Sequence, residues 1–91
     1  MSQHILYHYD ACPYCQKVRR AIAELNIADR IELRDTLKDP ANRQALVALT
    51  QRTQVPCLVT HGKPMLESSD IVAYLYQQYG NGKRPAARGG L

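Results

Sequence analysis

Two cysteines with two residues between them, Cys12 and Cys15 in the segment DACPYCQ, are the side chains of this chain best suited to chemistry. A thiol pair at this spacing can hold a metal ion, close a structural disulfide, or exchange disulfides with another molecule. The chain has three cysteines, and an odd count argues against a secreted fold held together by disulfides. We therefore expect a reducing, cytoplasmic compartment, where such pairs are more often catalytic or metal-binding than structural.

A metal centre is a minor alternative for this pair. Zinc takes four ligands, usually from two CxxC-like pairs or from one such pair and two histidines. The other candidate ligands are Cys57, His4, His8 and His61, and none of them has ligand spacing. We therefore expect no metal, and an inert structural pair is an equally minor alternative.

The elements around the pair favour disulfide exchange. Residues 4–9 (HILYHY) are typical of a strand, and from Pro13 apolar residues recur at helical spacing. The residues of that helical face are Cys15, Val18, Ile22 and Leu25. Cys12 then opens the helix, where unpaired N–H groups and the positive end of the dipole favour a thiolate. Nearby positive charge from Lys17, Arg19 and Arg20 acts in the same direction.

The two thiols are expected to differ. Cys15 lies one turn further along, on the core-facing side of the helix, so we expect it to be more buried and less acidic than Cys12. This asymmetry suits a division of labour in which Cys12 attacks a disulfide and Cys15 resolves the mixed disulfide that forms.

The rest of the chain predicts one α/β domain over residues 1–79. Strands are expected at residues 30–35, 55–61 and 64–67, and a helix at residues 39–51 with Asp39 as its N-cap and Pro40 in its first turn. A last helix is expected to be capped by Ser68 or Ser69. The order β-α-β-α-β-β-α predicts a mixed four-stranded sheet with helices packed on it, a parallel first pair of strands, and an antiparallel hairpin through the HGK turn. Residues 80–91 are expected to form a disordered basic tail.

Two further segments can bind a ligand. In TQVPC, a cis bond before Pro56 would turn the N–H and C=O of Val55 towards an extended, peptide-like ligand, whereas a trans proline would only mark an edge strand. In ESSDI, the helix start at Ser68, Ser69 and Asp70 can bind an anion or can be a simple N-cap. The sequence leaves both choices open.

Several other residues have structural explanations. Cys57 is expected to be a small core residue of a central strand, and His8 and His61 to be surface or strand-end residues. The tyrosines of the last helix, Tyr74, Tyr76 and Tyr79, are expected to pack against the core.

Together these segments resemble the glutaredoxins and, equally, the thioredoxin-like N-terminal domain of glutathione S-transferases, over about residues 4–79. CPYC is the usual dithiol active site of glutaredoxins, and RTQVP is similar to their segment with a cis proline. GKPMLESSDIVAYL is closer to the transferase pattern, in which Glu-Ser before the third helix holds the γ-glutamyl end of glutathione. The resemblance implies a thioredoxin-like (glutaredoxin) fold.

The resemblance also implies roles for individual residues. Cys12 would be the nucleophile that becomes glutathionylated, and Cys15 the resolving thiol. Tyr14 would form an aromatic wall beside glutathione, and the main chain of Val55, next to Pro56, would bind its cysteinyl part. Arg43 would lie near its glycyl carboxylate. The γ-glutamyl end would be contacted by Glu67, Ser68, Ser69 and Asp70. The implied activity is glutathione-dependent reduction of protein–glutathione mixed disulfides, with glutathione as co-substrate.

The chain departs from the glutaredoxin pattern at three places. Asp10 is acidic where glutaredoxins commonly carry a lysine nearby, Leu66-Glu67 replaces a Gly-Gly pair, and Ser69 replaces the first of two aspartates. The helical second domain of the transferases is not part of this chain, so conjugating chemistry is not expected.

Two other functions remain as alternatives. The fold could bind glutathione, or an iron–sulfur cluster shared across a dimer, without catalysis, although Pro13 and Tyr14 would crowd a cluster. A net charge of +4 alone suggests nucleic acid, but Lys83, Arg84 and Arg88 of the tail supply much of it. We expect a monomer whose partners are glutathione and glutathionylated or disulfide-bonded proteins, with no nucleic acid and no membrane.

Overall fold

The computed structural model describes residues 3–80. Its elements follow the predicted order: β1 (His4–His8), α1 (Pro13–Leu25), a short 3₁₀ turn (Ala28–Arg30), β2 (Ile31–Asp35), α2 (Pro40–Thr50), β3 (Cys57–Thr60), β4 (Lys63–Met65) and α3 (Ser68–Tyr79). The prediction of a disordered tail falls, beyond Gly80, outside the described residues.

The four strands form one mixed sheet in the order β2-β1-β3-β4. The β1 and β2 strands are parallel and β3 is antiparallel to β4, as predicted. The β3 strand is also antiparallel to β1. The hairpin between β3 and β4 turns through His61 and Gly62, whose φ angles of 52° and 76° are both positive. Two positive φ angles are the requirement of the type I′ turn that suits the twist of a two-residue hairpin.

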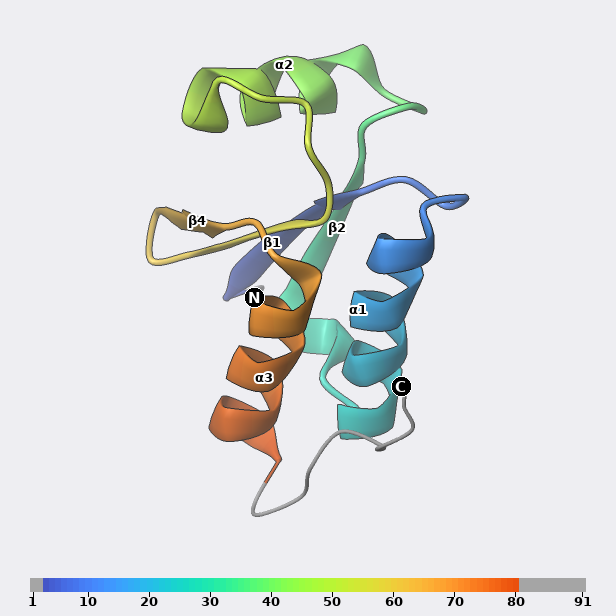
Figure 1. Cartoon of the computed structure of the whole chain (residues 1–91), viewed down its shortest axis with the longest axis vertical. Coiled ribbons are helices and arrows are strands. Elements are labelled where there is room, and N and C mark those ends of the chain that lie inside the picture. Colours follow the sequence, from blue (N-terminus) through green and yellow to red (C-terminus); the bar gives the residue numbers. More distant parts are fainter. Residues whose placement is uncertain (1–2, 81–91) are drawn as a thin grey trace.

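The helices cover both faces of the sheet (Figure 1). On one face α1 and α3 pack side by side against the larger cluster of buried residues: Leu6, Val18, Ile22, Ile27, Ile31, Leu58, Ile71 and Leu75. On the other face α2 covers a smaller cluster of Tyr7, Leu46 and Cys57. Successive residues of β1 point to opposite faces, so Leu6 and Tyr7 belong to different clusters. Cys57 is therefore a core residue of a central strand, as predicted.

The helix starts agree with the sequence in two of three cases. Pro13 is the first residue of α1, and Asp39 caps α2 by accepting a hydrogen bond from the backbone N–H of Ala41 at 3.0 Å. The prediction that Ser68 or Ser69 caps α3 is wrong, because Glu67 occupies the N-cap position and Ser68 is already the first helical residue. The strands are also shorter than predicted at one or both ends.

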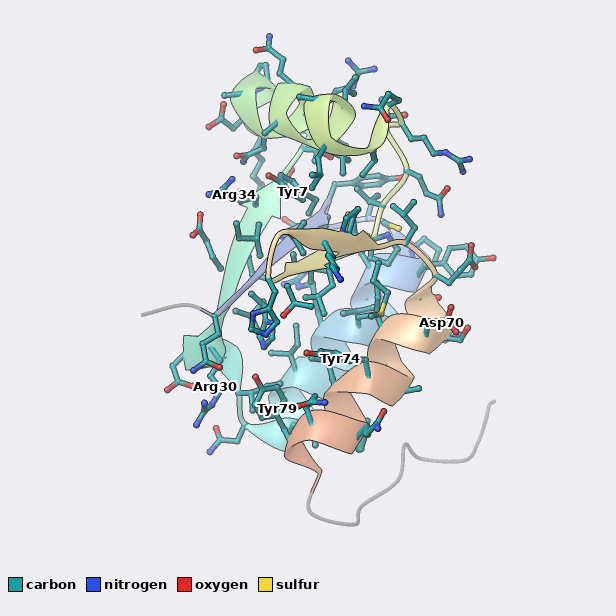
Figure 2. The ribbon with its side chains drawn as sticks, turned by 90° about the vertical axis from the view of Figure 1, so that its left-hand side faces the viewer. Tyr7, Arg30, Arg34, Asp70, Tyr74 and Tyr79 are labelled. Carbon is teal, nitrogen blue, oxygen red and sulfur yellow. The ribbon has the colours of Figure 1, made fainter. Side chains whose placement is uncertain are left out.

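The end of the sheet remote from the cysteine pair is held by His4. Its ring nitrogens lie 2.8 Å from Oγ1 of Thr60 and 2.6 Å from the hydroxyl of Tyr79. The Arg30 guanidinium lies 5.4 Å from the centre of the Tyr79 ring, and Figure 2 shows the two side by side. Tyr74 and Tyr79 pack against the core and Tyr76 is buried, so the packing role predicted for these tyrosines is confirmed.

None of the helices within residues 3–80 has both the length and the apolar character needed to cross a lipid bilayer.

Candidate active site

Cys12 occupies the N-cap of α1, just beyond the carboxyl end of β1. Its own N–H donates to the carbonyl of Tyr9 at 3.2 Å, which fixes the turn between strand and helix. Its Sγ accepts a hydrogen bond from the backbone N–H of Cys15 at 3.3 Å. Pro13 has no N–H to leave unpaired at the first helical position, which explains why proline is tolerated there. The sulfur of Cys12 therefore faces the free N–H groups of the helix start.

Cys15 lies on the core side of α1 and is fully buried. Burial, and then the hydrogen bond with Cys12, raise the pKa of the Cys15 thiol to about 12. A raised pKa is the direction that the sequence predicts for Cys15. The contrast in exposure is small, because Cys12 is itself only 4% exposed.

Strand register brings three distant segments to this end of the sheet. Tyr7 of β1 pairs with Cys57, the first residue of β3, so Val55 and Pro56 enter β3 beside the end of β1 from which the chain leads to Cys12. Leu58 pairs with Met65, so the start of α3 follows at the same end. The amide of Gln54 donates to the carbonyl of Leu66 at 3.3 Å and links the last two segments. The bond between Val55 and Pro56 is cis, which decides the alternative that the sequence left open.

The residues expected to bind glutathione differ in exposure. Tyr14 is 60% exposed, Glu67, Ser69 and Asp70 are exposed, Val55 and Ser68 are half-buried, and Pro56 is buried. Figure 2 shows Asp70 at the start of α3, directed away from the core. No side chain caps α3, so the first N–H groups of this helix remain available to an anion.

Arg43 lies on α2, which covers the opposite face of the sheet from α1 and α3. Its side chain is exposed, and no hydrogen bond or ion pair with the described residues holds it in place.

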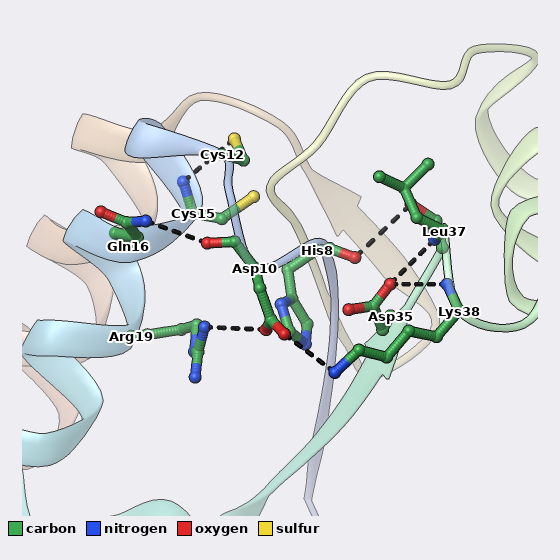
Figure 3. A network of polar contacts seen from close by, with 10 residues as sticks. His8, Asp10, Cys12, Cys15, Gln16, Arg19, Asp35, Leu37 and Lys38 are labelled. Carbon is green, nitrogen blue, oxygen red and sulfur yellow. Dashed lines mark hydrogen bonds and ion pairs between the residues drawn. The ribbon is translucent and has the colours of Figure 1, made fainter.

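Asp10 connects the loop before Cys12 to two other elements (Figure 3). Its carboxylate binds Arg19 of α1 at 3.2 Å and Lys38 of the loop after β2 at 2.8 Å, and its carbonyl accepts from Gln16 at 2.9 Å. The hydrogen bond from Lys38 is the main reason that the pKa of Asp10 lies below its ordinary value. The acidic charge that departs from the glutaredoxin pattern is thus paired with two cations.

His8 ends β1 and is therefore a strand-end residue, which is one of the two predicted alternatives, and it is not a surface residue, because it is only 4% exposed. Its Nδ1 has no hydrogen-bond partner among the described residues. Burial is the largest cause of its lowered pKa, followed by the charge of Arg19. His8 pairs with Asp35 across the parallel strands. This pair could not be predicted from local patterns, because two residues that are 27 positions apart meet only through the strand register.

Comparisons with known proteins show the family of the fold that carries this site. The family model described as glutathione S-transferase, N-terminal domain matches residues 6–84. No curated protein matches the sequence.

Similar solved structures include glutathione S-transferase isozyme E7 from Drosophila melanogaster (26% identity, TM-score 0.69), which matches over 86% of this chain and 35% of its own. A possible glutathione S-transferase from Rhodopseudomonas palustris (28% identity, TM-score 0.72) matches over 96% of this chain and 42% of its own. A glutathione transferase homologue from Drosophila mojavensis with bound glutathione (24% identity, TM-score 0.73) matches over 89% of this chain and 37% of its own.

This chain therefore spans between a third and a half of the length of these structures. Of the two resemblances suggested by the sequence, the family match supports the transferase one. The predicted thioredoxin-like α/β fold, with its mixed four-stranded sheet, is confirmed. Since the family model covers most of the sequence, the chain belongs to the family of glutathione S-transferase N-terminal domains.

Proposed function

We propose that this domain is a glutathione-dependent thiol–disulfide oxidoreductase that reduces protein–glutathione mixed disulfides through Cys12 and Cys15. The observation that supports it most is the position of Cys12 at the N-cap of α1, with the N–H of Cys15 directed at its sulfur. A thiolate at this position keeps that hydrogen bond and faces the positive end of the helix dipole, and both stabilise its charge.

The reaction begins when the Cys12 thiolate attacks the glutathionyl sulfur of the mixed disulfide. The disulfide of the substrate breaks, and the substrate protein leaves as a thiolate that takes up a proton. The thiolate of a second glutathione then attacks the glutathionyl sulfur on Cys12, which releases glutathione disulfide and restores the Cys12 thiolate.

Cys15 offers a second route for the last step. Its thiolate would attack Sγ of Cys12, form the Cys12–Cys15 disulfide and release glutathione. The pKa of Cys15, raised to about 12, keeps this thiol protonated at neutral pH, so we expect the route through a second glutathione to be faster.

The proposed glutathione-binding site is formed by the residues at this end of the sheet. The γ-glutamyl carboxylate would accept from the open N–H groups at the start of α3 and from Ser68, while Glu67 or Asp70 would pair its ammonium group. The main chain of Val55 would bind the cysteinyl part of glutathione as an added strand does. Tyr14 would cover one side, and Ser69 and Arg43 would contact the two ends.

Turnover of a glutathionylated substrate, coupled to glutathione reductase and NADPH, tests the proposal. We expect no activity from Cys12→Ser and substantial activity from Cys15→Ser. Cys57→Ala is the matched control, because Cys57 is a buried thiol on the opposite face of the sheet from α1. An active Cys12→Ser variant would contradict the assignment of the nucleophile. A wild-type domain that binds glutathione but does not turn over would instead support a non-enzymatic binding module.

The proposal includes the setting predicted from the sequence. The domain would act as a monomer in the cytoplasm, where glutathione and a reducing poise are available, on glutathionylated or disulfide-bonded proteins.

A further inference from the structure

We propose that His8, Asp10 and Asp35 form a binding site for a divalent transition-metal ion of the zinc type at the carboxyl ends of β1 and β2. One ring nitrogen of His8 and one carboxylate oxygen from each aspartate lie within 4.8 Å of one another. In a tetrahedral zinc site two such ligand atoms lie about 3.4 Å apart, because each is about 2.0–2.2 Å from the ion. The three ligand atoms must therefore approach one another by up to about 1.4 Å to hold an ion.

His8 is prepared to act as a ligand. It is 4% exposed, and its Nδ1 is buried with no hydrogen-bond partner among residues 3–80. A buried polar atom without a partner carries a desolvation cost that a ligand can relieve. The buried, unpartnered Nδ1 is thus the observation that distinguishes this group from an ordinary cluster of surface charges.

The two aspartates are also held in position by hydrogen bonds. Lys38 donates to the carboxylate of Asp10, and the backbone N–H groups of Leu37 and Lys38 donate to that of Asp35. Asp35 is held rigidly by its two backbone donors and faces His8 across the sheet, whereas the side chain of Asp10 is 55% exposed and open to an arriving ion (Figure 3).

Two cationic side chains of the chain itself already pair with the carboxylate of Asp10. Nζ of Lys38 lies 2.8 Å from Asp10, and Arg19 lies 3.2 Å from the same carboxylate. Lys38 is 73% exposed, and exposed ion pairs contribute little to stability, so a divalent ion can displace its ammonium group. One imidazole and two carboxylates favour zinc-like ions over Mg²⁺ or Ca²⁺, which prefer oxygen alone.

The test measures Zn²⁺ binding by titration calorimetry in a Cys12→Ser/Cys15→Ala background, because the two thiols would otherwise bind zinc themselves. This background also makes the result independent of the proposed redox function. We expect Asp10→Asn to weaken Zn²⁺ binding at least tenfold, whereas Asp29→Asn, an exposed aspartate outside the cluster, leaves it unchanged. Removal of the competing ammonium group in Lys38→Gln should strengthen binding roughly two- to fivefold.

Nitrogen-15 NMR of the histidine rings identifies the ligand directly. Saturation with Zn²⁺ should shift one ring nitrogen of His8 and leave His4 and His61 unchanged. The proposal is overturned if Asp10→Asn binds Zn²⁺ as tightly as its parent, if Lys38→Gln does not strengthen binding, or if the His8 ring does not respond. The spectrum of the parent protein decides the matter even where a variant fails to fold.

Discussion

The backbone N–H of Cys15 donates to Sγ of Cys12 at 3.3 Å, while the thiol of Cys15 itself is buried beneath the helix. Cys15 thus donates a main-chain hydrogen bond to the sulfur of Cys12, while its own side chain is inaccessible to solvent. The pair is asymmetric because the N-cap position of α1 exposes free donors to Cys12, and the helical period turns Cys15 towards the core.

This asymmetry predicts selective alkylation. In the folded protein at pH 8, iodoacetamide should modify Cys12 and leave the other two cysteines intact, because burial raises the pKa of Cys15 to about 12 and that of Cys57 to about 11. Peptide mass spectrometry after quenching measures the modification at each site. The same treatment in denaturant should modify all three thiols. Equal labelling of Cys15 and Cys12 in the folded state would contradict the prediction.

A substitution at the start of α3 should weaken glutathione binding. Ser68→Ala removes a hydroxyl beside the open N–H groups of the helix, so we expect the KM for glutathione to rise roughly three- to tenfold, the usual effect of one hydrogen bond. Gln77→Ala, an exposed change near the other end of α3, is the matched control. An unchanged KM for glutathione in Ser68→Ala would show that Ser68 does not contact glutathione.

The attachment of α2 should depend on one leucine. Leu46 is the fully buried residue of this helix and contacts Tyr7 and Cys57, so Leu46→Ala should lower the free energy of unfolding by about 2–5 kcal/mol. Leu49→Ala, on the same helix but 38% exposed, should cost less than about 1 kcal/mol. Urea denaturation compares the two variants, and equal losses would show that α2 is not anchored in this way.

Stability should decrease in mild acid because of His4. Burial is the largest cause of its lowered pKa, followed by the charges of His61 and Arg30, so the folded state favours the neutral ring. The unfolded chain takes up this proton near pH 6.5, hence the stabilisation is complete above that pH and is lost as the pH falls towards the lower folded-state pKa.

Urea denaturation between pH 7.5 and 5 measures this loss. His4→Gln should reduce the pH dependence and leave the part due to His8, whose pKa burial also lowers. His61→Asn should keep most of the dependence, because burial affects His4 more than the charge of His61 does. An identical slope in His4→Gln and the wild type would refute the assignment to His4.

Local patterns were sufficient to predict most of the fold. The helical spacing from Cys15 to Ile22, the Asp39-Pro40 start of α2 and the HGK turn each depend on neighbouring residues, and each is present in the structure. The N-cap of α3 was misplaced because serine is a much commoner N-cap than glutamate, yet Ser68 enters the helix and Glu67 precedes it.

The site could be predicted where its residues lie in recognisable segments, and not where strand register assembles it. Cys12 and Pro56 were identified from their local motifs. The proximity of His8 and Asp35 depends on the pairing of β1 with β2, and the ion pair between Asp10 and Lys38 depends on two loops that this pairing brings together. Burial of His8 follows from the same packing and leaves no mark in its neighbouring residues.

The two outer strands have a consequence for the behaviour of this domain at high concentration. Pro64 leaves β4 without one N–H donor and Lys63 adds a charge beside it, while the other edge, β2, carries the ion-paired Glu32 and Arg34. A strand from a second molecule would meet a missing donor on one side and charged side chains on the other. The sheet is thereby protected at both margins against the edge-to-edge growth that leads to amyloid-like aggregation.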